Sequence, residues 1–332
     1  MDHQLFECGD FALHGGGILR GARLAYKAVG TLNAARSNAI VYPTSFGTTH
    51  ADIEWLVGPG KALDPQRYFI IMPSMLGNGL SSSPSHGQPG TFPELSLWDS
   101  VRLQHRLVAE HYGIQRLALV LGFSMGGQQA YHWATLFPDR VERLAVMCAS
   151  ARTSARNRVF LGEIRAALTD DPAWNGRFFE ARAQRGVRAM AQVYADWALP
   201  AEFYRRETFR AIGFQSRQDF VARDWEVFLG RGDPNDLMAM MGVWERADVG
   251  GLPAFGGDTS LALRSIRAAA LIMPSTTDQY FLASGIEAEA RMISGARYCP
   301  IETIWGHRVN NPVQNPADAR FVDDNLRLLL AV

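Results

Sequence analysis

The sequence is poor in the features that mark several protein classes. It has three cysteines in 332 residues, Cys8, Cys148 and Cys299, which lie far apart and without Cys-x-x-Cys spacing. Neither a disulfide framework nor a cysteine zinc site is therefore predicted. No apolar run approaches the roughly 18 residues that a membrane-spanning helix needs, and the start MDHQLFECGD lacks the apolar run of a secretory signal. We expect a cytoplasmic protein that makes no membrane contact.

An excess of charge of one sign is also missing. Lys and Arg total 33, and Asp and Glu total 33, so the formal net charge is zero. A chain of this kind has no broad attraction to nucleic acid or to anionic membranes. A small molecule is the expected partner instead. Apolar residues make up 47% of the chain and charged residues 20%, a balance that is typical of a folded globular protein.

Short apolar runs alternate with helical patterns in the first half of the chain. Four runs are interpreted as buried strands, because they are short, rich in β-branched residues and end at Gly, Pro or Ser. They cover residues 39–43, 69–73, 117–122 and 144–149. Helical spacing of apolar residues follows at 97–113 and at 125–137. Continuous apolar strands alternating with helices predict a mostly parallel sheet with helices on both faces.

The pattern changes after Ser150. Residues 151–263 contain no clear strand run and predict several helices broken at Pro and Gly. A strand pattern returns at 268–274 and 297–304, followed by a last helix at 316–331. The sequence therefore predicts a core of residues 1–150 and 264–332, interrupted by a helical lid of residues 151–263.

One motif carries most of the predicted chemistry. Gly122-Phe-Ser124-Met-Gly126 joins a predicted strand to a predicted helix. A nucleophile elbow needs this order, with small residues two places on either side of the nucleophile, so that strand and helix backbones can approach each other. The helix start also directs the free backbone N–H of Met125 toward the site. The alternative is an ordinary strand–helix turn with an idle serine.

A serine hydroxyl needs an adjacent base to act as a nucleophile. If the base follows the serine along the chain, only two of the eight histidines qualify, His132 and His307. His132 lies eight residues along the elbow helix, about 12 Å up its axis. His307 lies in a loop directly after a predicted strand, where open α/β sheets present functional groups. We predict His307 as the base; a surface-loop histidine is the alternative.

A carboxylate on a loop after a strand should orient that base. Asp278 follows the predicted strand at 268–274 and meets this description. Asp258 and Asp233 are rivals without a preceding strand, and Asp278 itself has the alternative of capping the turn that follows it. For the second oxyanion donor, beside Met125, we predict the backbone N–H of Ser45, with Phe46 next, in the loop 43–50.

Three other patterns carry no predicted function. His14-Gly-Gly-Gly17 imitates an oxyanion motif of lipases but lies between two strand-like runs, which predicts a hairpin turn. Gly58-Pro-Gly-Lys61 lacks the spacing of a phosphate-binding loop. His50, His105 and His111 show no metal-ligand spacing with carboxylates or with one another, so no metal site is predicted.

Together these residues resemble the homoserine O-acetyltransferase branch of the α/β-hydrolase superfamily. The resemblance extends over nearly the whole chain and includes residues 57–71, 122–128, 133–141 and 171–176. It implies an α/β-hydrolase fold with a helical lid, a Ser–His–Asp triad at Ser124, His307 and Asp278, a covalent acyl-serine, and a homodimer formed through the lid.

The chain departs from that branch where the acyl acceptor binds. The transferases carry an arginine before a Thr-Tyr-Arg-Ser-like segment in the lid, whereas this chain has Gln-Val-Tyr-Ala-Asp-Trp at 192–197. They also follow the catalytic histidine with aspartate, whereas Arg308 follows His307 here. We therefore expect hydrolysis of an ester or related small acyl substrate without a cofactor. The alternatives are an O-acetyltransferase that uses acetyl-CoA as a cosubstrate, and a non-catalytic binding protein on the same fold.

Overall fold

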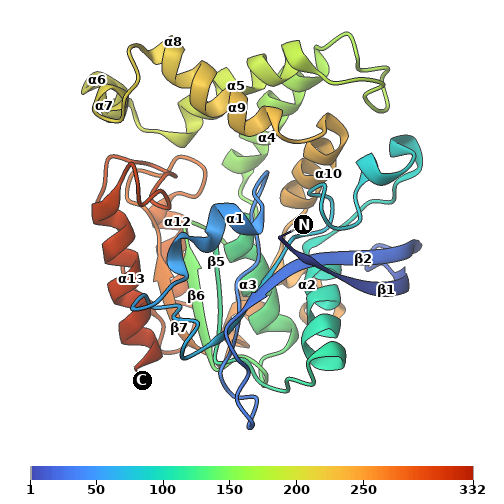
Figure 1. The fold of residues 1–332 in the computed structure, drawn as a ribbon, viewed down its shortest axis with the longest axis vertical. Coiled ribbons are helices and arrows are strands. Elements are labelled where there is room, and N and C mark those ends of the chain that lie inside the picture. Colours follow the sequence, from blue (N-terminus) through green and yellow to red (C-terminus); the bar gives the residue numbers. More distant parts are fainter. Residues whose placement is uncertain (1, 332) are drawn as a thin grey trace.

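A central sheet of eight strands organises the molecule, which is described here by a computed structural model over residues 2–331 (Figure 1). The strand order is β1-β2-β4-β3-β5-β6-β7-β8. The first two strands pair antiparallel with each other, and β2 pairs antiparallel with β4; the remaining neighbours pair parallel. The predicted mostly parallel sheet is thus confirmed. The strands are β1 Gln4–Ala12, β2 Ile18–Val29, β3 Ala39–Val41, β4 Phe69–Pro73, β5 Leu119–Phe123, β6 Arg143–Met147, β7 Ala269–Met273 and β8 Arg297–Tyr298.

The hairpin predicted at His14 is confirmed as the connection between β1 and β2. The Leu13 amide donates to the Gly17 carbonyl oxygen at 3.1 Å, and Gly16 and Gly17 have φ values of 94° and 83°. Glycine reaches this region without a Cβ clash, which is why the turn is glycine-rich. The hairpin lies at the sheet edge opposite β8, away from β5.

Helices occupy most of the remaining chain. The α-helices are α1 His50–Ile53, α2 Leu97–Arg106, α3 Met125–Leu136, α4 Ala155–Thr169, α5 Gln184–Ala198, α6 Ala201–Arg205, α7 Thr208–Ala211, α8 Arg217–Phe220, α9 Val227–Gly230, α10 Pro234–Glu245, α11 Thr259–Arg264, α12 Ala283–Ala290 and α13 Pro316–Leu330. Five 3₁₀ turns are η1 Glu54–Leu56, η2 Pro84–His86, η3 Pro89–Thr91, η6 Val249–Gly251 and η7 Pro253–Phe255, and two π-helical segments are η4 Leu107–His111 and η5 Val221–Glu226. Within residues 2–331, no helix combines the length and apolar character needed to cross a bilayer.

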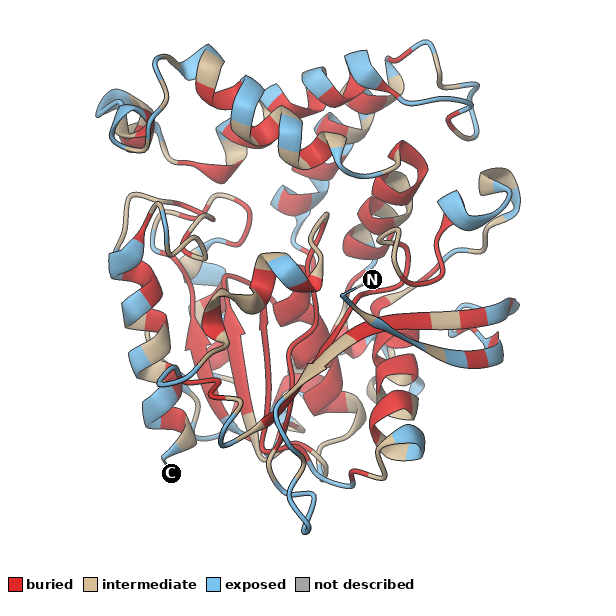
Figure 2. Cartoon of the chain, viewed as in Figure 1, coloured by how far each residue is buried: buried red, intermediate tan, exposed pale blue. Residues whose placement is uncertain are grey.

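The sheet separates two apolar layers. Alternate strand residues face opposite sides, so Val120 packs with the α3 side chains Tyr131 and Trp133 in one buried cluster. Its neighbours Leu119 and Leu121 pack in a second cluster, which includes Val322, Leu326 and Leu329 of α13. Figure 2 shows the central strands β3 to β7 almost entirely buried between these helices, whereas β1 and β2 are partly exposed. The buried central strands explain the continuous apolar runs in the sequence.

The chain between β6 and β7 contains helices and no named strand. Helices α5 to α9 form a separate layer over the end of the sheet where β5 and β6 finish, and α4 and α10 connect toward the core (Figure 1). Residues of this inserted segment (151–263) are buried where they face the core or one another and exposed on the outer surface (Figure 2). The layer is positioned to cover whatever lies at the carboxyl end of β5.

Two predicted elements differ from those observed. The strand expected at 297–304 is only two residues long. The Cys299 and Ile301 amides, on either side of Pro300, still donate to the carbonyl oxygens of Ile272 and Pro274, but Pro274 has no N–H to donate in return. Pairing resumes beyond it as an isolated bridge between Ser275 and Ile301. The helix expected at 97–113 is also divided, with α2 followed by the π-helical η4.

Candidate active site

Ser124 lies on a sharp turn between β5 and α3. Its φ of 55° and ψ of −129° are unusual for a residue with a side chain. A Cβ on Gly122 would lie 2.0 Å from the Gly126 carbonyl oxygen, and a Cβ on Gly126 would lie 2.7 Å from the Pro43 carbonyl oxygen. Both positions therefore require glycine, and the close approach that they permit holds Ser124 in its strained conformation.

His307 and Asp278 meet in a buried pair. Nδ1 of His307 lies 2.6 Å from Oδ2 of Asp278, whose side chain is fully buried. The second carboxylate oxygen, Oδ1, accepts the amide hydrogens of Tyr280 at 2.8 Å and Phe281 at 3.1 Å. Asp278 therefore both caps the following turn and holds the histidine. Because a carboxylate only accepts, Nδ1 carries the hydrogen and Nε2 keeps its lone pair.

The imidazole of His307 is held by packing as well as by Asp278. Its ring lies 4.6 Å from that of Phe123 and 4.8 Å from that of Tyr280, centre to centre. Its backbone N–H donates to the carbonyl oxygen of Ala198 in the inserted segment at 2.8 Å. A Cβ on Gly306 would lie 2.3 Å from that same oxygen, so glycine is required immediately before the histidine.

Ser124 and His307 line one cavity of about 420 Å³. The structure thus brings together the three side chains predicted from the sequence: Ser124, His307 and, behind the histidine, Asp278. In the part of the chain that is described, Oγ of Ser124 and Nε2 of His307 make no hydrogen bond, so the serine–histidine bond is not formed in this state. Such bonds often tighten only when substrate is present.

The rival residues have other roles. Asp258 accepts the amide hydrogen of Leu261 at the start of α11, and Asp233 accepts that of Asn235 at the start of α10. His132 is fully buried, with Nδ1 2.7 Å from the Gln128 carbonyl oxygen. Burial lowers the pKa of His132 to about 4. It is a neutral core histidine.

The predicted oxyanion role of the Ser45 amide needs correction. That N–H donates to Oγ1 of Thr48 at 2.7 Å, so the hydrogen already has a partner. The Ser45 side chain supports the elbow instead: Oγ accepts the Gly126 amide hydrogen at 3.1 Å and donates to the Phe123 carbonyl oxygen. Among residues 2–331, nothing accepts the amide hydrogens of Phe46 and Met125. These two amides are the available oxyanion donors.

The cavity lies between the core and the inserted segment and has largely aromatic walls. Its aromatic lining residues are Phe46, Trp55, Phe123, Tyr194, Trp225 and Phe228. The inserted segment contributes Tyr194 from α5, Trp225 from η5 and Phe228 from α9. The sequence does not show which aromatic residues of this segment face the site, because their spacing follows helix packing and gives no sign of a contact with Ser124.

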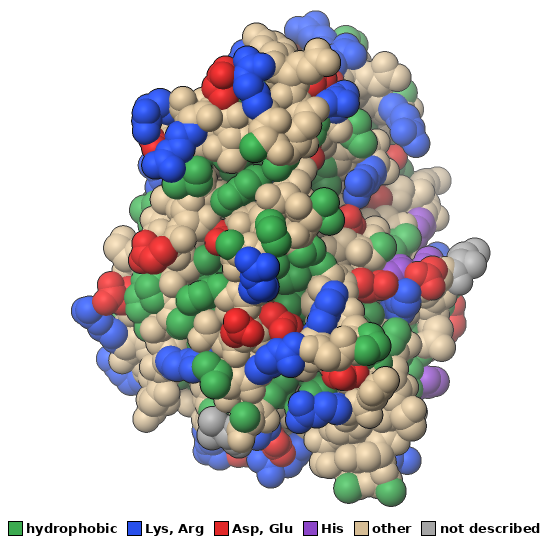
Figure 3. All heavy atoms as spheres, turned by 60° about the vertical axis from the view of Figure 1, so that its left-hand side comes forward, with side chains coloured by type: hydrophobic (Ala, Val, Ile, Leu, Met, Phe, Trp, Pro, Cys, Tyr) green, Lys and Arg blue, Asp and Glu red, His purple; other side chains and the backbone are tan. Residues whose placement is uncertain are grey.

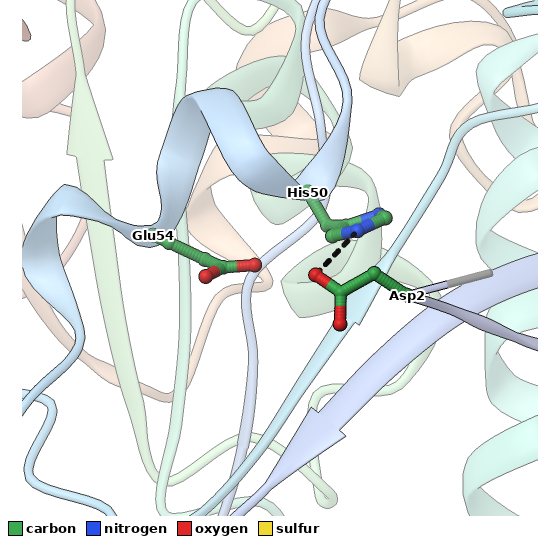
Figure 4. A group of neighbouring side chains, drawn as sticks. All are labelled: Asp2, His50 and Glu54. Atoms are coloured by element: carbon green, nitrogen blue, oxygen red, sulfur yellow. Dashed lines mark ion pairs between the residues drawn. The ribbon is translucent and has the colours of Figure 1, made fainter.

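A second cluster corrects the expectation that His50 has no carboxylate at ligand spacing. Glu54 follows His50 by one helical turn, and Asp2 approaches from the N-terminal segment, so that ligand atoms of all three lie within 4.8 Å of one another (Figure 4). The ammonium of Lys27 already pairs with Asp2 at 2.7 Å and with Glu54 at 2.8 Å. Burial also lowers the pKa of His50. Lys27 therefore supplies the cation that these carboxylates need, and a metal would have to displace it.

A nucleophile elbow at the carboxyl end of a mostly parallel sheet, with a histidine–aspartate pair on later loops, defines the α/β-hydrolase class. The chain belongs to the alpha/beta hydrolase fold family, whose model matches residues 40–283. It is an enzyme of this family, as its relatives are esterases and acyltransferases.

Relatives and solved structures divide between two activities. The chain is 36% identical to an ethyl acetate hydrolase of Pseudomonas veronii, over 92% of this chain and 88% of the relative. It is 32% identical to a homoserine O-acetyltransferase of Zymomonas mobilis, over 95% and 91%. The structure of the acetyl esterase MekB superposes with a TM-score of 0.95 at 35% identity, covering 99% of this chain and 97% of that one. The predicted resemblance is thus confirmed, with esterases among the most similar relatives.

Proposed function

We propose that the protein is a serine esterase that hydrolyses small acyl esters, acetyl esters among them. The observation that carries the proposal is the buried His307–Asp278 pair, 2.6 Å apart, opening onto the same cavity as the strained Ser124. The acetyl group is suggested by the ethyl acetate hydrolase and the acetyl esterase to which the chain is similar.

In the first half of the proposed reaction, Oγ of Ser124 attacks the ester carbonyl carbon while Nε2 of His307 takes the hydroxyl proton. The amide hydrogens of Met125 and Phe46 stabilise the resulting oxyanion. His307 then returns the proton to the leaving alkoxide, the C–O bond breaks, and the alcohol departs. Asp278 holds the imidazole in the required tautomer and stabilises the imidazolium. Ser124 is left as an acyl ester.

In the second half, water replaces the alcohol. His307 takes a proton from water, the hydroxide oxygen attacks the acyl carbon, and collapse of the intermediate returns the proton to Oγ of Ser124. The products are free enzyme and the carboxylic acid, which releases its proton to solvent and becomes the carboxylate. The chemistry needs no cofactor. We propose further that the inserted segment acts as a lid, since Tyr194, Trp225 and Phe228 close one side of the cavity.

Water is the proposed acceptor because, among the described residues that line the cavity, no arginine or lysine is left without a carboxylate partner to bind an amino-acid acceptor. Within residues 192–197, only Tyr194 lines the cavity, whereas the transferase pattern places arginines in this part of the lid. Both arginines that line the cavity, Arg231 and Arg308, are already paired with carboxylates. Acetyl transfer from acetyl-CoA to a hydroxylated acceptor is the alternative, favoured by the homoserine O-acetyltransferase relatives.

We also propose a cytoplasmic homodimer joined through the inserted segment. The described chain holds three free cysteines and no disulfide, as a reducing compartment requires. Val159 and Val227, on α4 and α9, are large apolar side chains that are more than half exposed. Sedimentation velocity of the wild type and of a Val159→Glu/Val227→Glu variant tests the dimer, which the charged variant should dissociate.

The test of the enzymatic proposal combines turnover with active-site labelling. Wild-type protein should hydrolyse ethyl acetate and p-nitrophenyl acetate and react with a fluorophosphonate probe at Ser124. The Ser124→Ala variant should fold, as judged by circular dichroism, yet neither label nor turn over. Folded wild-type protein that neither labels nor hydrolyses any acyl ester would support the non-catalytic alternative.

A further inference from the structure

The cavity that Ser124 and His307 line contains equal numbers of acidic and basic side chains, and each acidic side chain lies beside a basic one. Four of them line it: Asp52, Asp224, Arg231 and Arg308. Arg308 forms an ion pair with Asp224, and Arg231 forms one with Asp52 at 3.0 Å. Each pair joins the core to the inserted segment, because Arg308 and Asp52 belong to the core, whereas Asp224 and Arg231 belong to the segment.

The Arg308–Asp224 pair is the inner one. Arg308 directly follows His307 in sequence, and both lie on the cavity wall. The side chains of Arg308 and Asp224 are each only 18% exposed, and the guanidinium lies 4.9 Å from the ring centre of Trp225. Little solvent reaches this pair, so the charges are weakly screened and each depends on the other for compensation.

The Arg231–Asp52 pair is closer to solvent. The Arg231 side chain is 57% exposed and that of Asp52 is 29% exposed. Water and salt screen charges at such positions, and loss of one partner leaves the other largely hydrated. The two pairs therefore provide a matched comparison: both line the same cavity and both cross from core to segment, yet the Arg308–Asp224 pair is less exposed than the Arg231–Asp52 pair.

We propose that Asp224 determines specificity by neutralising Arg308, which restricts the site to uncharged esters and excludes those bearing a carboxylate near the ester group. This inference rests on the proposed esterase function and names the substrate class of that site. A substrate carboxylate that enters the cavity loses its hydration. It gains no cation in return, because the guanidinium of Arg308 is already paired with Asp224.

Removing the charge of Asp224 should reverse this preference. In an Asp224→Asn variant, Arg308 remains in the cavity without its carboxylate partner and is free to bind a carboxylate of the substrate with a charge-assisted hydrogen bond. Asparagine keeps the size of the side chain and can still accept one hydrogen bond from Arg308, so the segment should remain in place. The change in charge, rather than in shape, is what the variant tests.

The experiment compares acetoxyacetate, an anion at pH 7.5, with its neutral and nearly isosteric amide, acetoxyacetamide. The measured quantity is the ratio of kcat/KM for the anion to kcat/KM for the amide, obtained from acetate release. Wild-type enzyme should favour the amide. We expect Asp224→Asn to raise the ratio by about tenfold or more, on the order of one charge-assisted hydrogen bond, and added salt should reduce the gain.

Two further variants show whether Arg308 carries the effect. Asp224→Asn/Arg308→Gln should lose the gain, because no cation remains. Asp52→Asn, at the exposed pair, should change the ratio by less than about threefold, because Arg231 is screened. If Asp224→Asn fails to fold, Arg308→Gln alone serves instead: it leaves Asp224 uncompensated and should lower the ratio below that of wild type.

The outcomes separate this inference from the proposed function. A wild type that hydrolyses neither of these esters nor p-nitrophenyl acetate contradicts the esterase proposal itself. A wild type that hydrolyses the amide, combined with an unchanged ratio in Asp224→Asn, contradicts the role of Asp224 alone. An equal gain in the double variant also overturns it, because the gain would then not depend on Arg308.

Discussion

His307 is fixed from two sides at the scale of single residues. Asp278 holds Nδ1 at 2.6 Å, and the Ala198 carbonyl oxygen holds the backbone N–H at 2.8 Å. A base that must accept a proton at Nε2 and later return it benefits from one fixed orientation, because any rotation of the ring removes the lone pair from the serine. In the proposed reaction, the carboxylate would also stabilise the positive charge that forms on the ring.

Asp278→Asn tests this role. An asparagine of the same shape can donate to Nδ1 and so favours the wrong tautomer, and it brings no negative charge. We expect kcat for ethyl acetate hydrolysis to fall on the order of 10³–10⁴-fold with little change in the fold. Asp258→Asn is the control, since Asp258 caps α11 and asparagine caps helices equally well. A loss in the control as large as in Asp278→Asn would refute the assignment.

A second residue-scale prediction concerns stability in acid. Burial lowers the pKa of His132 to about 4, against 6.5 for the free side chain. Between these values the unfolded chain binds a proton that the folded chain does not, so stability falls as pH drops from 6.5 toward 4 and is unaffected by this group above 6.5. A shift of this size corresponds to at most roughly 3 kcal/mol.

Urea unfolding at pH 7.5, 6.0 and 5.0 measures the effect. His132→Asn should be less stable than wild type at pH 7.5, because the ring that packs 4.3 Å from Trp98 is lost. Its free energy of unfolding should nevertheless decline less steeply on acidification. The exposed residue His86 provides the comparison, and His86→Asn should follow the wild-type slope. Parallel curves for His132→Asn and wild type would contradict the prediction.

The sequence is enough to predict that Ser124, His307 and Asp278 lie close together. Each follows a predicted strand of a parallel sheet, and the carboxyl ends of such strands lie at one edge of the sheet. The oxyanion donor was harder to predict from the sequence. Whether the Ser45 amide or the Phe46 amide is free depends on where the Thr48 hydroxyl points. Side-chain rotamers within a loop leave no periodic signal in a sequence.

At the scale of elements, the strand–turn–helix of β5 and α3 is the unit that creates the site. The backbone of α3 approaches β5 so closely that there is no room for a methyl group at Gly122, and this close approach holds Ser124 in its turn. Gly122→Ala should therefore force α3 away from β5, lower the free energy of unfolding by more than about 2 kcal/mol and remove activity.

Gly162 in α4 offers a control at which alanine should raise, rather than lower, the free energy of unfolding. An added Cβ there meets no heavy atom within 4 Å, and the residue lies in the interior of a helix. Gly162→Ala should stabilise the protein by about 0.5–1 kcal/mol with activity retained, because alanine favours helix. Both variants are compared with wild type by urea unfolding. A neutral effect of Gly122→Ala would show that the elbow is not as tightly packed as the structure describes.

Elements were predictable where local pattern and tertiary packing agree. The buried strands β3 to β7 appear as continuous apolar runs, because each is covered on both faces. The length of β8 was overestimated, since pairing beyond residue 298 is interrupted opposite Pro274 and returns as the isolated bridge between Ser275 and Ile301. The division of the 97–113 helix into α2 and η4 was not predictable, because a π-helical segment changes the hydrogen-bond register without changing the apolar spacing.

Opposite charges are balanced at the scale of the whole molecule. Acidic and basic side chains are interspersed over the face shown in Figure 3, in keeping with a net charge of zero. The cavity follows the same rule, with two carboxylates against two guanidinium groups. The net charge was evident from composition, but the pairing of Asp224 with Arg308 was not, because 84 residues separate them.

The overall architecture also explains why the acyl acceptor was the hardest property to predict. In the proposed assignment, the core supplies the nucleophile, the base and the oxyanion donors, which an esterase and an O-acetyltransferase would share. The inserted segment supplies Tyr194, Trp225 and Phe228 of the aromatic walls and one half of each ion pair, and its helices show no motif that identifies what they bind. The acceptor therefore has to be established by measurement.

The most direct measurement follows the acetyl group from ethyl acetate in the presence of excess homoserine, with products quantified by NMR. The account predicts that acetate forms in an amount equal to the ethanol released, that O-acetylhomoserine does not accumulate, and that Ser124→Ala forms neither product. O-acetylhomoserine formed in excess over acetate, and dependent on Ser124, would show that the acyl group passes to an alcohol rather than to water and would contradict the central claim.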